Sequence, residues 1–582
     1  MKGLNRFWPI VVPALAVLLT LGSLRVGWCL DDYYQRWVIQ GSPGYADVGR
    51  KPLDAFCFID GDSRRNGRMI EQGLLPWWVD TRAKAAFWKP LTVLTHMLDY
   101  QLWPNRPALM HAQSVFWFAL LVGSVCMLFR RVMRPTLAAA IAALLYAVDH
   151  SRAVPVAWLA NRNSVLAALF GVLAIHAHIV ARRKGSRAMA FLSPVFLTMC
   201  LLSAEAGIGA VAYLVAFALT LDPAGWRRGL LRLWPHLLVV AAWRIAWSAQ
   251  GYGVYGIEDL YTDPGAHPLR FALIVLQRAP LYMLGQWTGF PSEVHWAVSA
   301  PFISAMWWTG VLVSSLLAVI VIPTARRSRV VRFCALGMVL ATIPMCSAAP
   351  MNRHLMFIGL GAAGLLGQFL ATSLHPRFWR GPVIRRAGGG VLVSVLVCIH
   401  LVLAPIALAI LARFPIGPPE FLVALHALPV EPDPARDLII VNHPLPMDVL
   451  HLLTGRAVDR QSLPRTVRVL APATTAVHVL RTDERTLLMR PDSGYFPLPP
   501  SRLGYNRDDP FTVGRVIALP SMTVTIMEMT GDDRPAAVQF RFAAALDDAS
   551  LQWVYWESGG FYEFRPPAVG EAIIIPASGL PF

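Results

Sequence analysis

Charged residues are scarce in this sequence. Only 15% of its 582 residues are charged, whereas 55% are hydrophobic and the mean hydropathy is +0.49. Soluble domains carry about a quarter charged residues, so this composition excludes an ordinary soluble domain. Acids are scarcer than bases, and the formal net charge is +17. The basic residues are nearly all Arg and lie in short loops between apolar runs, which indicates cytoplasmic loops of a membrane protein and no nucleic-acid partner. We therefore predict a polytopic α-helical membrane protein whose basic loops also contact membrane lipids.

Other absences narrow the class further. The seven cysteines form no CxxC motif, so a zinc ribbon or a thioredoxin-like site is not indicated. Cys29 and Cys57 are expected outside the cytoplasm, where they are either free thiols or joined by a disulfide. The sequence has no internal repeat of fixed period and no low-complexity tract. No small-residue cleavage site follows the first apolar run, which we therefore expect to remain as a membrane span.

The apolar runs predict about eleven transmembrane helices, since a span needs roughly 20 apolar residues. The candidates are 8–30, 109–129, 136–150, 163–181, 188–204, 206–221, 232–249, 301–323, 331–349, 355–374 and 390–413. With this count, the arginine clusters after the second, fourth, sixth, eighth and tenth spans all lie on one side. The N-terminus is then cytoplasmic and the C-terminus periplasmic, in a bacterial inner membrane. We expect 271–290 and 88–103 to be interfacial or re-entrant helices.

Two regions follow from this pattern. Residues 1–414 form the transmembrane domain, with a long first outer loop at 31–108. Residues 415–582 contain no cysteine and no long apolar run, and they show short alternating segments between turns. This pattern predicts a small β-rich extracytoplasmic domain at the C-terminus.

An acidic pair, Asp31 and Asp32, directly follows the first candidate span. A carboxylate at the membrane surface can act as a general base toward a hydroxyl, or can hold a divalent metal ion. Neighbouring residues on a helix do not point the same way, so one of the two is expected to face the site. Alternatively, the pair only marks the outer end of the span.

Further polar residues fall in the predicted outer loops. Most arginines of this chain are predicted to be cytoplasmic, so an arginine on the outer side indicates an anionic partner. A guanidinium binds phosphate in a bidentate manner. Alternatively, these residues pair with one another, as Arg152 with Asp149 or Glu205 with Arg244. The candidate substrate-binding residues are Lys89, His96, Asp99, Asp149, Arg152, Arg162, Glu205, Arg353 and His354.

These elements, taken in order, resemble the GT-C superfamily of polytopic glycosyltransferases. The nearest likeness is to the branch of transmembrane O-mannosyltransferases that act on cadherins, with their bacterial relatives. It rests on the acidic pair, Lys-Pro-Leu-Thr…Leu-Asp-Tyr at 89–100, Val-Ala-Trp-Leu-Ala-Asn-Arg at 156–162, Leu-Leu-Ser-Ala-Glu at 201–205 and Asn-Arg-His at 352–354. The chain departs from relatives at Ala153-Val154-Pro155, where they carry an acid, and at Ala204, where many have Lys.

The resemblance implies inverting transfer of a sugar from a polyprenyl-phosphate donor to a glycan, lipid or protein acceptor on the outer face. It implies Asp31 or Asp32 as the base and Arg162 and Arg353 on the donor phosphate. No cofactor is certain, and a divalent metal ion is an option that the missing acid weakens. A non-catalytic assembly factor for envelope polysaccharide on the same scaffold is the alternative. A secondary transporter is disfavoured, because paired broken spans are absent from the sequence pattern.

Overall fold

The computed structural model describes residues 4–380, 383–506 and 509–577, which form two compact units. The helical unit consists of Met1–Trp28, Phe87–Gly251 and Asp263–Ile416. The β unit consists of Cys29–Ala86, Tyr252–Thr262 and Gly417–Phe582. Most of the first outer loop therefore belongs to the same unit as the C-terminal domain.

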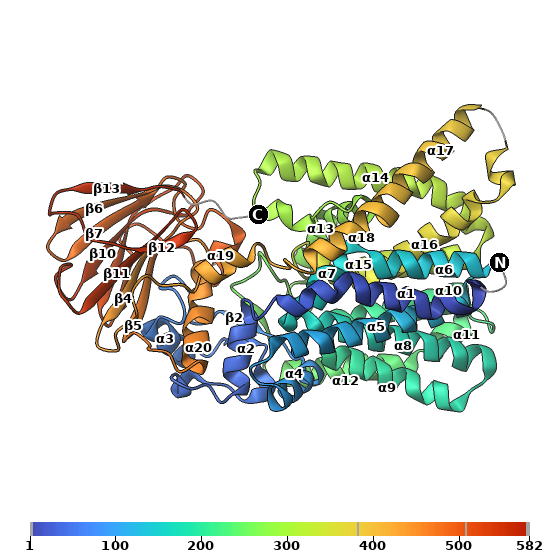
Figure 1. Cartoon of the computed structure of the whole chain (residues 1–582), viewed down its shortest axis with the longest axis horizontal. Coiled ribbons are helices and arrows are strands. Elements are labelled where there is room, and N and C mark those ends of the chain that lie inside the picture. The colour runs from blue at the N-terminus through green and yellow to red at the C-terminus, as the bar shows by residue number, and fades with distance from the viewer. Residues whose placement is uncertain (1–3, 381–382, 507–508, 578–582) are drawn as a thin grey trace. The chain divides into compact units, whose positions relative to one another are not determined.

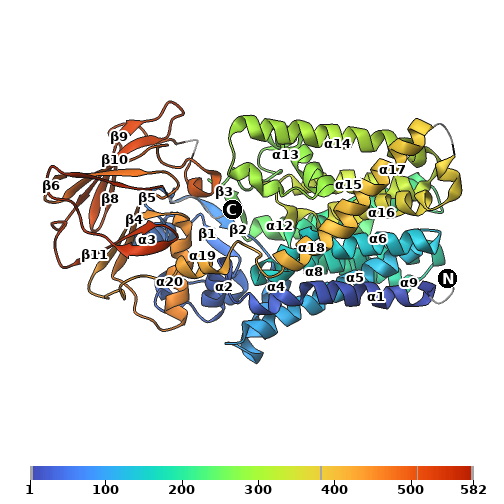
Figure 2. The same cartoon turned by 45° about the horizontal axis from the view of Figure 1, so that its top comes forward.

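A helix overlaps each of the eleven predicted spans. The helices are α1 (Leu4–Thr20), α5 (Pro107–Val132), α6 (Thr136–Val148), α8 (Arg162–Lys184), α9 (Arg187–Ser203), α10 (Gly209–Thr220), α12 (Trp234–Ala249), α14 (Ala300–Arg327), α15 (Arg329–Met345), α16 (Met356–Ser373), and α17 (Val383–Val397), which a π-helix joins to α18 (Ala404–Leu411). Two segments expected at the interface are also helical: α4 (Pro90–Leu102) and α13 (Pro268–Thr288). In Figures 1 and 2, α1, α5 and α8 run side by side.

The count of eleven spans is not confirmed. Six helices of the described chain are long and apolar enough to cross a membrane, or seven if the bent pair Thr136–Val148 and His150–Ala157 forms one span. Helix α10 shows why the others fall short: its 12 residues reach about 18 Å, against a hydrocarbon core of about 30 Å.

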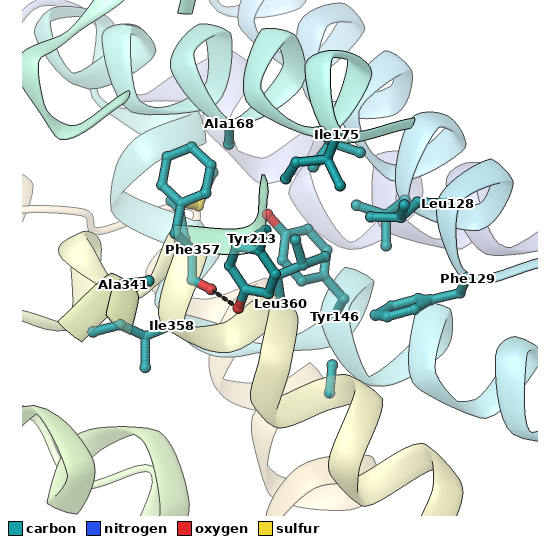
Figure 3. Packing of buried hydrophobic residues seen from close by; sticks show 14 of the residues in the cluster. Leu128, Phe129, Tyr146, Ala168, Ile175, Tyr213, Ala341, Phe357, Ile358 and Leu360 are labelled. Carbon is teal, nitrogen blue, oxygen red and sulfur yellow. Dashed lines mark hydrogen bonds between the residues drawn. The ribbon is translucent and has the colours of Figure 1, made fainter. Parts of the chain in front are cut away.

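The core of the helical unit depends on close approaches at glycines. A Cβ at Gly361 of α16 would lie 2.4 Å from the Cys334 carbonyl oxygen of α15, and one at Gly367 would lie 2.6 Å from the Ala142 Cβ of α6. Small residues bring helix backbones together in this way in membrane proteins. Figure 3 shows the centre of the cluster, where the buried hydroxyl of Tyr213 donates a hydrogen bond of 2.6 Å to the Phe357 carbonyl.

The β unit contains three sheets. A three-stranded sheet has the order β1 (Cys57–Asp60), β2 (Lys84–Ala86), β3 (Gly253–Tyr255). A six-stranded antiparallel sheet has the order β13 (Ala572–Ile575), β6 (Val477–Asp483), β7 (Thr486–Pro491), β10 (Pro535–Phe542), β9 (Met522–Met529), β8 (Val516–Leu519). A four-stranded sheet has the order β12 (Gly560–Glu563), β11 (Leu551–Glu557), β4 (Asp437–His443), β5 (Thr466–Pro472). The predicted β-rich character of the C-terminal domain is confirmed.

The four-stranded sheet differs from the alternating strands expected. Strand β4 pairs in parallel with both β5 and β11, and helix α20 (Val449–Val458) connects β4 to β5. All seven residues of β4 are buried, as is usual for a parallel strand covered on both faces. Such a strand carries no period-two pattern from which to predict it.

The first outer loop folds together with the C-terminal domain inside the β unit. Trp77 is almost fully buried and packs against the rings of Tyr495, Phe496, Phe511 and Phe540. The guanidinium of Arg468 donates to the carbonyl oxygens of Ile70 (3.0 Å) and Glu71 (2.7 Å). The loop contributes helix α2 (Asp31–Ile39) and helix α3 (Ser63–Gln72) to the unit.

Candidate functional site

The acidic pair begins a helix rather than ending one. Helix α1 ends at Thr20, a 3-10 turn continues to Arg25, and α2 starts afresh at Asp31 in the β unit. The candidate span runs from Phe7 to Arg25 and so ends five residues before the predicted end at residue 30. The non-helical stretch contains Leu30 at φ 44°, which turns the chain into α2. Carboxylates are favourable in the first turn of a helix, where backbone N–H groups lack partners.

The two acids have different surroundings, as the helix geometry predicts. Asp32 is 1% exposed, and its Oδ2 accepts a hydrogen bond of 3.0 Å from the backbone N–H of Cys29. The Asp31 side chain is 33% exposed. Cys29 and Cys57 are both free thiols, so the disulfide option is wrong. Asp31 is thus the accessible acid, and Asp32 holds the start of the helix.

Asp31 belongs to a chain of acids and imidazoles that extends into the C-terminal domain. Its Oδ1 lies 3.3 Å from Nε2 of His451, and Nδ1 of His451 lies 2.9 Å from Oδ1 of Asp448. The other oxygen of Asp448 lies 3.0 Å from Nε2 of His426. Burial disfavours the charged form of His451, but the hydrogen bonds and negative charges of Asp31 and Asp448 outweigh it and raise its pKa to about 9.

Asp448 is 2% exposed in this chain of groups. Burial opposes its ionisation, but the charges and hydrogen bonds of His426 and His451 hold its pKa far below the usual range. Asp448, His451 and His426 are not among the candidate residues predicted from the sequence. The i, i+3 spacing of Asp448 and His451 was the available signal, and it is too common in helices to single out a site.

In the helical unit, Asp99 and Arg162 form a completely buried ion pair. Both side chains are 0% exposed, and Nη1 of Arg162 lies 2.6 Å from Oδ2 of Asp99. The guanidinium also donates to Ser114 Oγ (2.9 Å) and Thr95 Oγ1 (3.3 Å), and its remaining partners are the Met110 carbonyl (2.8 Å) and the Gln113 side chain. The donors of the Arg162 guanidinium are therefore already bonded to other residues of the chain. This favours a structural role for Arg162 over the predicted phosphate contact.

His96 and Asp99 share one face of α4, as their spacing predicts, with 3.9 Å between Nδ1 and Oδ2. Burial and the charge of Arg162 lower the pKa of His96 well below its usual range, so its ring is neutral. Burial raises the pKa of Asp99 to about 6, although Arg162 acts in the opposite direction. Asp99 is still largely ionised at pH 7, which is consistent with its ion pair.

A second polar cluster joins loops that are distant in sequence. His150 lies between Asp149 (Nδ1 to Oδ1, 3.7 Å) and the side-chain amide of Asn352 (3.1 Å from Nε2). The carbonyl oxygen of that amide accepts from Ser292 Oγ (2.9 Å), and the backbone N–H of Asn352 donates to Glu293 (3.2 Å). The predicted second, fourth and fifth outer loops therefore meet within the helical unit.

Arg152 lies beside this cluster and is completely buried. Its guanidinium lies 4.2 Å from the centre of the Tyr146 ring, and its Nη2 is a buried donor without a hydrogen-bond partner in the described chain. The alternative of a direct ion pair with Asp149 is not observed among the described residues. Asp149 instead accepts from the backbone N–H of Ser151 at 2.9 Å.

Arg353 is half-buried, and its guanidinium lies over the Trp158 ring at 5.2 Å. Within the described ranges it forms no ion pair, and its buried Nε has no hydrogen-bond partner. The neighbouring His354 bonds through Nδ1 to the Tyr282 hydroxyl at 3.0 Å. Burial and the positive charges of Arg353, Lys89 and Arg278 lower the pKa of His354 well below its usual range. The three cations share these surroundings with one acid, Glu293, on which Arg353 also acts electrostatically.

Glu205 is not paired with Arg244, and that alternative is wrong. Its Oε1 accepts from the backbone N–H of Trp88 (2.7 Å) and lies 3.4 Å from Nε1 of Trp247. Arg244 instead pairs with Asp263 at 2.9 Å. Glu205 thereby fixes the residue that precedes Lys89, so its place in the site is a supporting one.

The possibility of a divalent metal ion was tested against the side chains that could act as ligands. Among the residues that the structure describes, no group of three or more His, Cys, Asp or Glu side chains is placed to hold a metal ion. The residues around Asp31 therefore do not fit a metal centre.

No protein-family model matches this sequence, and no curated protein matches it. Several solved membrane glycosyltransferases have similar structures. The archaeal oligosaccharyltransferase AglB from Archaeoglobus fulgidus, in complex with an inhibitory peptide and a dolichol-phosphate, matches with a TM-score of 0.43 and 12% identity, over 80% of this chain and 65% of its own. ArnT from Cupriavidus metallidurans matches with a TM-score of 0.40 and 12% identity, over 76% of this chain and 84% of its own. The arabinofuranosyltransferase AftD from Mycobacteria matches with a TM-score of 0.35 and 16% identity, over 94% of this chain and 42% of its own.

With TM-scores under 0.5 and identities under 25%, these likenesses show neither a superfamily nor the O-mannosyltransferase branch that the sequence resembles. The chain spans about two thirds of the length of the oligosaccharyltransferase. TM-scores of this size transfer neither residue roles nor substrates from the neighbours to this chain.

Proposed function

We propose that this protein is a membrane glycosyltransferase that transfers a sugar from a polyprenyl-phosphate donor to an acceptor hydroxyl on the periplasmic side of a bacterial inner membrane. In this proposal the N-terminus is cytoplasmic, residues 1–414 carry the spans, and residues 415–582 are periplasmic. The observation that carries the proposal is the division of the acidic pair into a buried acid, Asp32, and an accessible one, Asp31, whose Oδ1 is held by an imidazole.

Asp31 is the proposed base. Its carboxylate takes the proton of the acceptor hydroxyl as the acceptor oxygen bonds to the anomeric carbon of the sugar. The bond from that carbon to the phosphate oxygen breaks, and its electron pair leaves with polyprenyl phosphate. Attack from the side opposite the phosphate inverts the anomeric centre. A well-placed base contributes about 10²–10⁴-fold to such a step.

Arg353 is the proposed ligand of the donor phosphate. Its guanidinium has no ion pair in the described chain, it stacks on Trp158, and it shares its surroundings with Lys89. Charge develops on the phosphate as the sugar leaves, so a cation in partly desolvated surroundings favours the transition state. Arg162 and Arg152, by contrast, are completely buried.

The test compares single variants of the full chain, purified in detergent and reconstituted in liposomes. The probes are radiolabelled sugars linked to polyprenyl phosphate, and the readout is release of free polyprenyl phosphate in the presence of an envelope extract. Asp31→Asn is expected to lower kcat about 10²–10⁴-fold, and Arg353→Gln to raise the KM for the donor. Asp492→Asn, an exposed acid of the β unit, is the matched control. Full activity of Asp31→Asn would reject the proposal.

One observation favours the alternative, a non-catalytic assembly factor for envelope polysaccharide. Arg162, expected on the donor phosphate, is occupied by Asp99 and neutral acceptors. An assembly factor would bind polyprenyl phosphate without turning over any donor of the panel. It would also tolerate Asp31→Asn in a test of polysaccharide export.

A further inference from the structure

We propose that His451, held by Asp448 on the C-terminal domain, is a positioning residue that orients Asp31 for proton transfer. This inference rests on the proposed role of Asp31 as the base. It assigns to the C-terminal domain a direct part in the reaction, through a side chain more than 400 positions away in the sequence.

Helices α2 and α20 lie side by side in Figures 1 and 2, and three contacts along them fix their register. His451, Gly455 and Asp459 are four residues apart, so they lie along one face of α20 and its C-terminal end. His451 contacts Asp31, and Nη1 of Arg36 lies 2.7 Å from Oδ1 of Asp459. Between these two ion pairs, any Cβ at position 455 would lie 2.9 Å from the Tyr33 ring, so only glycine permits this approach.

The imidazole of His451 has no freedom to turn. Its side chain is 12% exposed, and each ring nitrogen faces a carboxylate oxygen. Asp448 is fixed in turn, because His426 holds its second oxygen and the Tyr33 ring packs edge-on against His426 at 4.8 Å. A ring between two carboxylates donates from both nitrogens and is therefore an imidazolium, in agreement with its raised pKa.

The arrangement leaves one oxygen of Asp31 for the acceptor. Oδ1 faces His451, while no described residue forms a hydrogen bond or ion pair with Oδ2 of this side chain, which is 33% exposed. A base works best when a third group fixes its orientation, as in nucleophile–base–orienter triads. The ion pair with His451 also places a positive charge beside Oδ1. His451 therefore sets the direction of the base.

The test measures kcat, the KM for the donor and the pH profile of His451→Gln in the full chain, with the same polyprenyl-phosphate-linked probes. We expect kcat to fall about 10²-fold, the cost typical of a misplaced catalytic group, with the KM for the donor unchanged. The wild-type kcat is expected to fall as the pH rises through about 9, where His451 loses its proton and with it one of its two hydrogen bonds, and His451→Gln is expected to lack this basic limb. His478→Gln is the matched control, since His478 lies 2.9 Å from Asp492 in an exposed pair of the same domain.

The outcomes separate this inference from the proposed function. If Asp31→Asn abolishes transfer while His451→Gln keeps the wild-type kcat, the positioning role is overturned and the base assignment stands. If Asp31→Asn is fully active, the proposed function itself fails. A lower kcat that keeps the wild-type basic limb would also overturn the inference, because it would show a packing role alone. Should His451→Gln not fold, Asp448→Asn is judged by the same criteria.

Discussion

The buried pair of Asp99 and Arg162 allows a quantitative prediction. Replacing Asp99 by Ala leaves a guanidinium that is 0% exposed without its counter-ion, surrounded only by neutral acceptors such as Ser114 Oγ and the Met110 carbonyl. Breaking a buried ion pair from one side costs about 3–5 kcal/mol, because the remaining charge stays desolvated. Asp99→Asn should cost less, since the amide oxygen keeps a hydrogen bond to a charged donor, worth about 1.5–3 kcal/mol.

The double variant Asp99→Ala with Arg162→Met gives the sharpest result. It removes both charges, so we expect it to be more stable than Asp99→Ala alone. Unfolding in mixed micelles, with increasing SDS as the denaturant, measures the differences. Glu528→Gln is the control, because the ion pair of Glu528 with Arg490 is exposed and its loss should have no measurable effect. A double variant less stable than Asp99→Ala would refute the reasoning. In the transfer assay, a rise in the KM for the donor with no change in kcat would show that Arg162 binds the donor phosphate.

Three further predictions concern the β unit. The raised pKa of His451 means that its contribution to stability is complete below about pH 6.5 and is lost as the pH rises through about 9. Thermal unfolding of the full chain should therefore show stability falling between these pH values, and His451→Gln should remove this pH dependence. Trp77→Ala should lower the free energy of unfolding by about 3–5 kcal/mol and make both the first outer loop and the C-terminal domain sensitive to protease, because the Trp77 ring packs between them. Cleavage of only one of the two would contradict this prediction. Gly73→Ala should destabilise more than Gly27→Ala in the same unfolding assay: both glycines have positive φ, but only at Gly73 would a Cβ lie 2.1 Å from the Val467 carbonyl oxygen.

Much of the helical unit could be predicted from sequence, because an apolar run needs no partner to be recognised. Each predicted span overlaps a helix, and the helical character of α13 was expected from its composition. The length of a span was harder to predict. The run up to residue 30 looks continuous, yet α1 ends at Thr20, a 3-10 turn ends at Arg25, and a new helix starts at Asp31 in another unit.

In the candidate site, too, local features were easier to predict than tertiary ones. His96 and Asp99 were expected on one helix face from their spacing, and the structure places them there. The pairing of Glu205 with Trp88 and Trp247 depends on tertiary packing, which spacing does not encode. The contact between Asp31 and His451 joins segments that no periodicity connects. Local spacing therefore predicts contacts between residues close in the chain, whereas a contact such as that of Asp31 with His451 arises only from the fold.

The β unit is assembled from three stretches that leave the ribosome far apart in time. The roughly 490 residues between Ala86 and Ile575 take about 25–100 s to synthesise at about 5–20 residues per second. For most of that interval Ile70 lacks its partner Arg468 of β5 and Trp77 lacks its partner Phe540 of β10, so the nascent loop presents apolar side chains and unpaired backbone groups. We therefore expect the nascent first outer loop to be prone to aggregation and proteolysis until the C-terminal domain is synthesised.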